Sequence, residues 1–260
     1  MQIPIYQVDA FAKRLFGGNP AAVCPLNEWL PDDKLQSIAL ENNLAETAYF
    51  VRDGDGKYKL RWFTPAVEVD LCGHATLASA FVIFTELDHG CNEARFQTRS
   101  GELVVTREGG LLSMDFPSRP PGEVSFPPEL VDALGGSPEA VLGARDYLVV
   151  YRTEAEVRAL KPNMDVLTQL DLFAVIVTAP GDDVDFVSRF FAPKQGIPED
   201  PVTGSAHCTL TPYWSQRLGK KSLHGRQVSP RGGEVWCTDC GDRVRIAGNA
   251  VKFLTGVIEV

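Results

Sequence analysis

The stretch "YKLRWFTP" at residues 58–65 and the stretch "FVSRFFAP" at residues 186–193 are near copies of each other. Each has an arginine, a phenylalanine two residues later and a proline two residues after that. The second copy begins 128 residues after the first, from residue 58 to residue 186, about half of the 260-residue chain. A repeat of half the chain length predicts two similar halves.

The segments around the two copies repeat in the same order. A helix-like segment and a strand-like segment precede each copy, and a glycine that opens an apolar helix follows it. We therefore predict an α+β fold of two similar duplicated domains, each with a mostly antiparallel sheet and a central helix. The matching segments are 33–43 and 154–160 (helices), 47–51 and 173–178 (strands), and Gly73-His74-Ala75 and Gly204-Ser205-Ala206, where the offset grows to 131 residues.

The predicted join is the stretch 116–128, which contains five prolines. Proline disfavours helix and central strand, so this stretch should cross between domains in an extended form. We assign 1–117 to the first domain and 118–260 to the second. The stretch 235–260 alternates like several strands, and a return of the last of these strands to the first domain is the open alternative.

Composition narrows the classes of function. A net charge of −9 and a pI near 5.0 argue against a nucleic-acid or anionic-membrane partner. The longest apolar stretches, such as 77–84, are far shorter than the roughly 20 residues of a membrane span, and no signal peptide is visible, so we expect a cytoplasmic protein. The lone pair Cys237 and Cys240 is interpreted as two reduced thiols at a hairpin, and half a zinc site or a redox pair is the alternative.

The glycines at 73 and 204 each stand immediately before the first turn of an apolar helix. A helix N-terminus offers free N–H groups and a positive dipole end, so it attracts anions. Two such termini predict a site for a small carboxylate in a cleft between the halves. The alternative is a pair of capped helices that touch only each other.

Titratable side chains flank both glycine turns. Proton transfer needs an acid and a base beside a bound substrate, and a carboxylate with an imidazole could supply them. Cys72 stands directly before the first glycine, and Thr203 holds the equivalent position in the second half. The titratable candidates are Asp70 and His74 at the first turn and Glu199, Asp200 and His207 at the second.

Four motifs resemble those of one known family. They are "FGGNPAAV" at 16–23, "NLAETA" at 43–48, "CGHAT" at 72–76 and "DPVTGSA" at 200–206, in that order. Together they resemble the PhzF-like isomerases of phenazine biosynthesis, which are relatives of diaminopimelate epimerase in fold. The resemblance implies sheets curled around central helices, an active site between the domains, a homodimer, and a reaction that uses no metal and no organic cofactor.

The resemblance also implies roles for individual residues. Glu46 would be the principal acid/base of a proton shift, with Asp200 and His74 assisting it. The composition around Glu46 does not single it out, since a glutamate at a strand start is mostly a surface residue. The implied substrate-binding residues are Gly73, Gly204, Ser205, Thr203, Cys72 and Asn19.

The sequence thus predicts a cofactor-independent isomerase that moves a proton on a small carboxylate-bearing substrate, cyclic or amino-acid-like. One alternative is an epimerase or racemase of a small amino acid, although related two-thiol racemases need a cysteine at the Thr203 position. A second is a non-catalytic protein that binds a small acid. A third is a metal enzyme using Cys72, His74, His207 and Cys208, the last two of which point about 100° apart on a helix.

Overall fold

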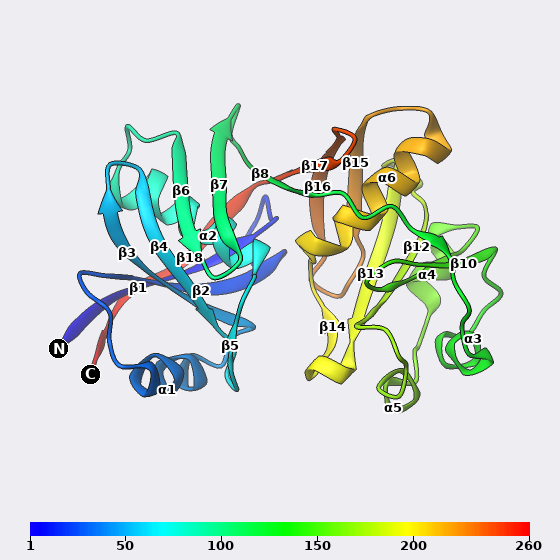
Figure 1. Ribbon diagram of the computed structural model, residues 1–260, viewed down its shortest axis with the longest axis horizontal. Coiled ribbons are helices and arrows are strands. Elements are labelled where there is room, and N and C mark those ends of the chain that lie inside the picture. Colours follow the sequence, from blue (N-terminus) through cyan, green and yellow to red (C-terminus); the bar gives the residue numbers. More distant parts are fainter. The chain divides into compact units, whose positions relative to one another are not determined.

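The computed structural model describes residues 1–260 and divides them into two compact units (Figure 1). The first unit comprises Met1–Asp115 and Ala247–Val260, and the second comprises Phe116–Ile246. The chain therefore crosses between units twice. The sequence predicts a boundary at 117/118 and does not decide to which domain the last strand belongs. In the structure, residues 247–260 belong to the first unit.

The sheet of the first unit is mixed but mostly antiparallel. Strands β18–β1, β1–β2, β3–β4, β4–β5, β6–β7 and β7–β8 pair antiparallel, while β2–β3 and β4–β6 pair parallel. In Figure 1 the red β18 accompanies the blue β1. The strands are β1 (Gln2–Ala10), β2 (Asn19–Leu26), β3 (Glu46–Gly54), β4 (Lys57–Phe63), β5 (Glu68–Val69), β6 (Glu93–Thr98), β7 (Gly101–Glu108), β8 (Leu111–Pro117) and β18 (Ala250–Glu259).

The second unit repeats this order of pairings. Strands β9–β10, β10–β11, β12–β13, β13–β14 and β15–β16 pair antiparallel, while β11–β12 and β13–β15 pair parallel. The duplicated α+β fold predicted from the repeat is confirmed. The strands are β9 (Gly122–Glu123), β10 (Ala140–Gly143), β11 (Tyr147–Val150), β12 (Val175–Pro180), β13 (Phe186–Ala192), β14 (Ile197–Asp200), β15 (Ser222–Gln227), β16 (Gly233–Asp239) and β17 (Arg243–Gly248).

Each unit has a central helix. Helix α2 (Gly73–Val82) is buried along nearly its whole length and contacts β1, β2, β3, β7 and β18. Helix α6 (His207–Leu218) contacts β15 and β16, and its fully buried Trp214 stacks on Phe186 of β13. No helix combines the length and apolar character needed to cross a bilayer. The other helical segments are α1 (Asp32–Asn42), η1 (Ile83–Leu87), α3 (Pro128–Leu134), α4 (Glu154–Ala159), α5 (Met164–Leu167), η2 (Pro193–Gln195) and η3 (Gly204–Ala206).

The repeated arginine and phenylalanine build the same arrangement in both units. The Arg61 guanidinium binds both carboxylate oxygens of Glu68, at 2.7 and 2.8 Å, and lies 5.1 Å from the ring centroid of Phe63. Arg189 does the same with Glu199, at 2.7 and 2.9 Å, and lies 4.9 Å from the Phe191 ring. Glu199, a candidate from the sequence because it flanks the second glycine turn, therefore serves a structural ion pair.

The C-terminal stretch forms β16, β17 and β18, as its alternation predicts. Gly241, with φ of 87°, lies in the turn between β16 and β17. Cys237 is buried in β16, and Cys240 is exposed beside that turn. The C-x-x-C pair therefore lies at the turn between two strands, as the alternation predicts.

Candidate active site

Glu46 enters the first unit's interior at the start of β3. Helix α1 ends at Asn43, whose φ of 50° turns the chain, and β3 then begins at Glu46. Strand β3 runs parallel to β2, with Glu46 opposite Ala21. Glu46 is therefore not the surface residue that its local sequence suggests, since only 8% of it is exposed.

Asn19 is delivered to the start of β2 by a turn that requires glycine. Gly18 has φ of 64°, and a Cβ atom there would lie 2.1 Å from the carbonyl oxygen of Ala10. An L-residue is excluded at Gly18 both by this clash and by the left-handed backbone. The next residue, Asn19, is fully buried beside the start of β3.

His74, in the first turn of α2, is held from both sides of its ring. Its Nδ1 atom lies 3.2 Å from Nδ2 of Asn19 and 3.5 Å from Sγ of Cys72. Its Nε2 atom lies 3.1 Å from Oε2 of Glu46. This last contact has ion-pair distance without hydrogen-bond geometry, and both of its atoms are buried with no hydrogen bond. Buried polar atoms are normally satisfied, so this pair retains unused hydrogen-bonding capacity.

The charges around His74 favour its protonated form. Burial alone would lower the pKa of His74, but the neighbouring Cys72 and Glu46 outweigh burial and raise that pKa well above its ordinary value. Burial also raises the pKa of the Cys72 thiol to about 11. Because Cys72 is then a neutral thiol near pH 7, Glu46 is the charge that holds the proton on His74.

The ligand atoms of Glu46, Cys72 and His74 lie within 4.8 Å of one another, a spacing compatible with a metal ion. Their arrangement around the ring is not. Cys72 contacts Nδ1 and Glu46 contacts Nε2, whereas one ion binds one ring nitrogen. The cluster therefore suits proton transfer better than metal coordination.

In the second unit, Asp200 ends β14 and organises the turn that follows. Its Oδ2 atom accepts a hydrogen bond from the Thr203 hydroxyl. The fully buried Gln227 fixes the same turn, because Nε2 donates to the carbonyl of Asp200 at 2.6 Å and Oε1 accepts from the amide of Thr203 at 2.9 Å. No sequence motif pointed to Gln227, which lies on a strand far along the chain.

The helix expected directly after Gly204 begins with a 3₁₀ turn, η3, and α6 starts only at His207. Neither Thr203 before η3 nor Cys72 before α2 caps the helix with its side chain. His207 is fully buried, and its Nδ1–H donates to the carbonyl of Thr203 at 2.8 Å. Burial lowers the pKa of His207 to about 4, so it is a neutral structural residue near pH 7.

Ser205 has a partner that the sequence did not reveal. Nη2 of Arg145 donates to Oγ of Ser205 at 3.2 Å. Arg145 lies between β10 and β11, 60 residues before Ser205, in a stretch without a recognisable motif. Only an alignment of the two halves by strand register brings it to notice.

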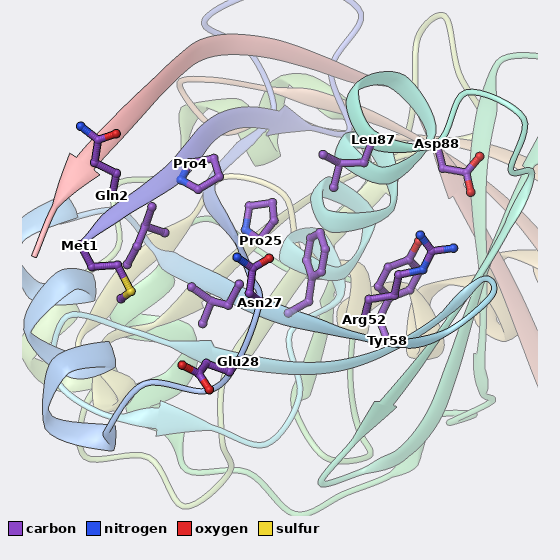
Figure 2. A pocket seen from close by; sticks show the side chains of 13 residues that line it. Met1, Gln2, Pro4, Pro25, Asn27, Glu28, Arg52, Tyr58, Leu87 and Asp88 are labelled. Atoms are coloured by element: carbon purple, nitrogen blue, oxygen red, sulfur yellow. The ribbon is translucent and has the colours of Figure 1, made fainter.

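A separate hollow of about 400 Å³ lies in the first unit (Figure 2). Its walls come from β1, the end of β2, β3, β4 and the end of η1. None of Asn19, Glu46, Cys72 and His74 lines it. This hollow is therefore not the candidate site. Its lining includes Pro4, Pro25, Arg52, Tyr58 and Asp88.

Comparisons with known proteins agree with the family resemblance. The family model described as "Phenazine biosynthesis-like protein" matches residues 8–256. An uncharacterized isomerase of Pseudomonas aeruginosa is 53% identical over 100% of both chains. A crystal structure of a phenazine biosynthesis protein of the PhzF family from Enterococcus faecalis is 48% identical, covers 100% of both chains and has a TM-score of 0.97.

A more distant structure shares the fold alone. It is a hydroxyproline epimerase from Agrobacterium vitis, with 9% identity, a TM-score of 0.60 and coverage of 99% of this chain and 92% of that one. The duplicated fold thus extends beyond the PhzF-like proteins to an epimerase.

Proposed function

The chain belongs to the PhzC-PhzF family of phenazine biosynthesis-like proteins, and on that basis we propose that it is an isomerase. It moves a proton on a small carboxylate-bearing substrate, cyclic or amino-acid-like, and uses no metal or organic cofactor. The observation that carries this proposal is the buried contact between Glu46 and His74.

Glu46 is the proposed base and acid in turn. Its carboxylate removes a proton from one carbon of the substrate, the electron pair of that C–H bond shifts into the adjacent π system, and the carboxylic acid returns the proton to another carbon. No atom is gained or lost. A positioned carboxylate of this kind typically contributes about 10²–10⁴-fold to a proton transfer.

The neighbours of Glu46 have positioning roles in this scheme. His74 fixes the orientation of the carboxylate, and Asn19 and Cys72 fix the ring of His74 from its other side. Asp200 assists from the second unit, where the Thr203 hydroxyl binds it. The proposed carboxylate-binding positions are Gly73 in the first unit and Gly204 and Ser205 in the second, because neither helix start has a side-chain cap.

Two observations disfavour a two-thiol racemase. Cys72 is a thiol with a pKa of about 11, which leaves little thiolate near pH 7. Thr203 occupies the position where the second thiol would stand. A single-carboxylate mechanism through Glu46 needs neither thiol.

The experiment is a screen of small carboxylic and amino acids for enzyme-dependent uptake of deuterium from D2O, followed by proton NMR. We expect at least one cyclic or amino-acid-like acid to exchange, and exchange to survive exhaustive chelation and desalting. The exposed Glu41→Gln variant on α1 is a matched control that should behave as wild type. A chain that bound acids without exchanging any of their protons would be a binding protein instead.

We also propose a homodimer. In the first unit β18 exposes Phe253, Leu254 and Val257 by 44%, 42% and 60%, an apolar set that a second copy could cover. Light scattering should give a mass near twice 28.4 kDa, and a mass near 28.4 kDa itself would contradict the proposal.

A cytoplasmic location is the last part of the proposal. All six cysteines are free, which is the usual state in a reducing compartment. Fractionation of the producing cells should recover the chain with the cytoplasmic markers.

A further inference from the structure

The two units can be aligned by strand register, and the alignment relates the residues around the two glycine turns to each other. Phe63 and Phe191 hold the same place in the repeated stretch. Phe63 is opposite Thr47, and Phe191 is opposite Val175. Thr47 and Val175 are therefore equivalent positions of the two units.

The neighbouring strands extend this equivalence. Thr47 is opposite Ala22 on β2, and Val175 is opposite Tyr147 on β11. Counting back from this pair, Arg145 takes the place of Pro20, the residue directly after Asn19. Arg145 thus lies where the first unit places the strand start that carries Asn19.

The glycine turns complete the comparison. Gly73 and Gly204 are equivalent, so Ser205 takes the place of His74. In the first unit Asn19 contacts His74, and in the second Arg145 contacts Ser205. In each unit a polar side chain therefore contacts the residue after the glycine: Asn19 from the first position of β2, and Arg145 from two residues before β11. The two contacts lie in neighbouring positions of the repeat and differ in chemistry.

Arg145 is held rigidly by a buried carboxylate. Nε and Nη2 bind Asp146 with contacts of 3.0, 3.2 and 2.8 Å, and only 1% of Asp146 is exposed. The guanidinium also lies 4.6 Å from the ring centroid of Phe173. A guanidinium fixed on two sides loses little entropy when it binds a further acceptor.

The bonds of Arg145 leave donors available. Nε and Nη2 donate to Asp146 and Ser205, whereas Nη1 has no protein partner and is not buried. Ser205 is half-buried, and its Oγ accepts from Arg145, so its hydroxyl hydrogen is free to donate elsewhere. Nη1 and the Ser205 hydroxyl are therefore two donors at one place.

A second guanidinium adds positive charge to this end of the unit. Nη1 of Arg119 is buried without a hydrogen bond, and the amide of Arg119 donates to the carbonyl of Cys208 at 2.9 Å. Burial raises the pKa of the Cys208 thiol to about 11, and the charges of Arg119 and Arg145 act against that rise. Two guanidinium groups thus reach the start of α6, with Asp146 as the counter-ion of one of them.

We propose that Nη1 of Arg145 and the hydroxyl of Ser205 bind a carboxylate of the substrate, so that Arg145 determines specificity for acids over their neutral analogues. This deepens the proposed function, since the ligand is its substrate. A carboxylate has the geometry that a guanidinium edge and a neighbouring hydroxyl can satisfy together. An uncharged amide offers one acceptor and no charge, so it should bind less tightly.

The test compares 3-fluorobenzoate with 3-fluorobenzamide, two probes of similar shape and different charge, by fluorine NMR titration. Wild type should bind the acid about tenfold or more tightly than the amide, and Arg145→Gln should lose most of that preference. Ser205→Ala should lose a smaller part. Arg152→Gln is the matched control, because the Arg152 side chain is 73% exposed and forms only a 3.5 Å contact with Glu139.

Arg145→Gln leaves the buried Asp146 unpaired and could unfold the chain, so two further variants are included. Arg145→Gln with Asp146→Asn removes both charges together. Arg145→Lys keeps the charge but not the fork of donors, and should lose part of the preference. Equal binding of acid and amide by wild type, or no binding of either at about 20 mM, would overturn the proposal.

A folded Arg145 variant with an unchanged preference would overturn it as well. The test is separate from that of the proposed function. Loss of the acid preference needs no turnover, and Glu46→Gln should leave the preference intact.

Discussion

In the first unit, Nε2 of His74 lies 3.1 Å from Oε2 of Glu46, and neither atom has a hydrogen bond although both are buried. A buried pair of this kind is costly to keep unless a further partner or a chemical task accounts for it. The strands and the helix that deliver the two side chains are fixed by ordinary packing. The unused hydrogen-bonding capacity therefore belongs to these two atoms themselves.

The first prediction concerns pH and His74. Its pKa is raised in the folded state, so its stabilising contribution is complete below about pH 6.5, the unfolded value, and is lost as pH rises through the folded value. The free energy of unfolding of wild type should fall over this range relative to His74→Gln. Urea unfolding from pH 6 to pH 9 would measure the difference, with the exposed His89→Gln as control. Parallel curves for wild type and His74→Gln would show that Glu46 does not hold the proton.

His207 should act in the opposite direction and at lower pH. Its folded pKa of about 4 lies below the unfolded value, so the unfolded chain binds the extra proton first. Stability should fall by roughly 3 kcal/mol from pH 7 to pH 4 through this residue alone. The slope should be missing in His207→Gln, again by urea unfolding. If His207→Gln lost as much stability between pH 7 and pH 4 as wild type, the carboxylates and not His207 would cause the loss.

The repeated ion pairs should be worth similar amounts in both units. The side chains of Arg189 and Glu199 are 12% and 16% exposed, and those of Arg61 and Glu68 are 19% and 13% exposed. Double-mutant cycles to alanine should give a coupling of about 1–3 kcal/mol for each pair.

The exposed pair of Arg52 and Asp55 is the control for these cycles. Its side chains are 60% and 104% exposed, so its coupling should be at most about 0.5 kcal/mol. A coupling near zero in one repeated pair and not in the other would mean that the duplication preserved the residues but not the free energy of their interaction.

Asp200→Asn should impair turnover, with the larger share of the loss in substrate binding. The change keeps the shape of the side chain and removes the charge that accepts from Thr203. For whichever acid the D2O screen identifies, KM should rise about tenfold or more while kcat falls less. Asp183→Asn, at a side chain that is 82% exposed, is the control. A loss confined to kcat would make Asp200 an acid/base rather than a positioning residue.

The fold was largely predictable because the repeated residues make the same contacts in both units. In each copy the arginine lies against the phenylalanine ring and pairs with a glutamate that follows the copy, so the repeated residues have the same structural task in both sheets. The pairing of β18 with β1 could not be predicted, because strand alternation does not indicate which strand lies next to which. The 3₁₀ turn before His207 also has no counterpart in the sequence pattern.

The site was only partly predictable. His74 and Asp200 were evident as titratable groups beside glycine turns, and Glu46 was found through the family resemblance. Gln227 and Arg145 were missed because each contacts the second turn from a strand region remote in the sequence. Contacts between residues far apart in the sequence produce no local spacing pattern from which they could be predicted.

The central claim is that Glu46 carries the proton. Glu46→Gln keeps the size and polarity of the side chain and removes its ability to exchange a proton. With the acid identified in the D2O screen, deuterium uptake should fall by about 10²-fold or more in Glu46→Gln while substrate affinity stays close to that of wild type. Exchange close to the wild-type rate in a folded Glu46→Gln protein would contradict the claim and leave Asp200 or Cys72 as the base.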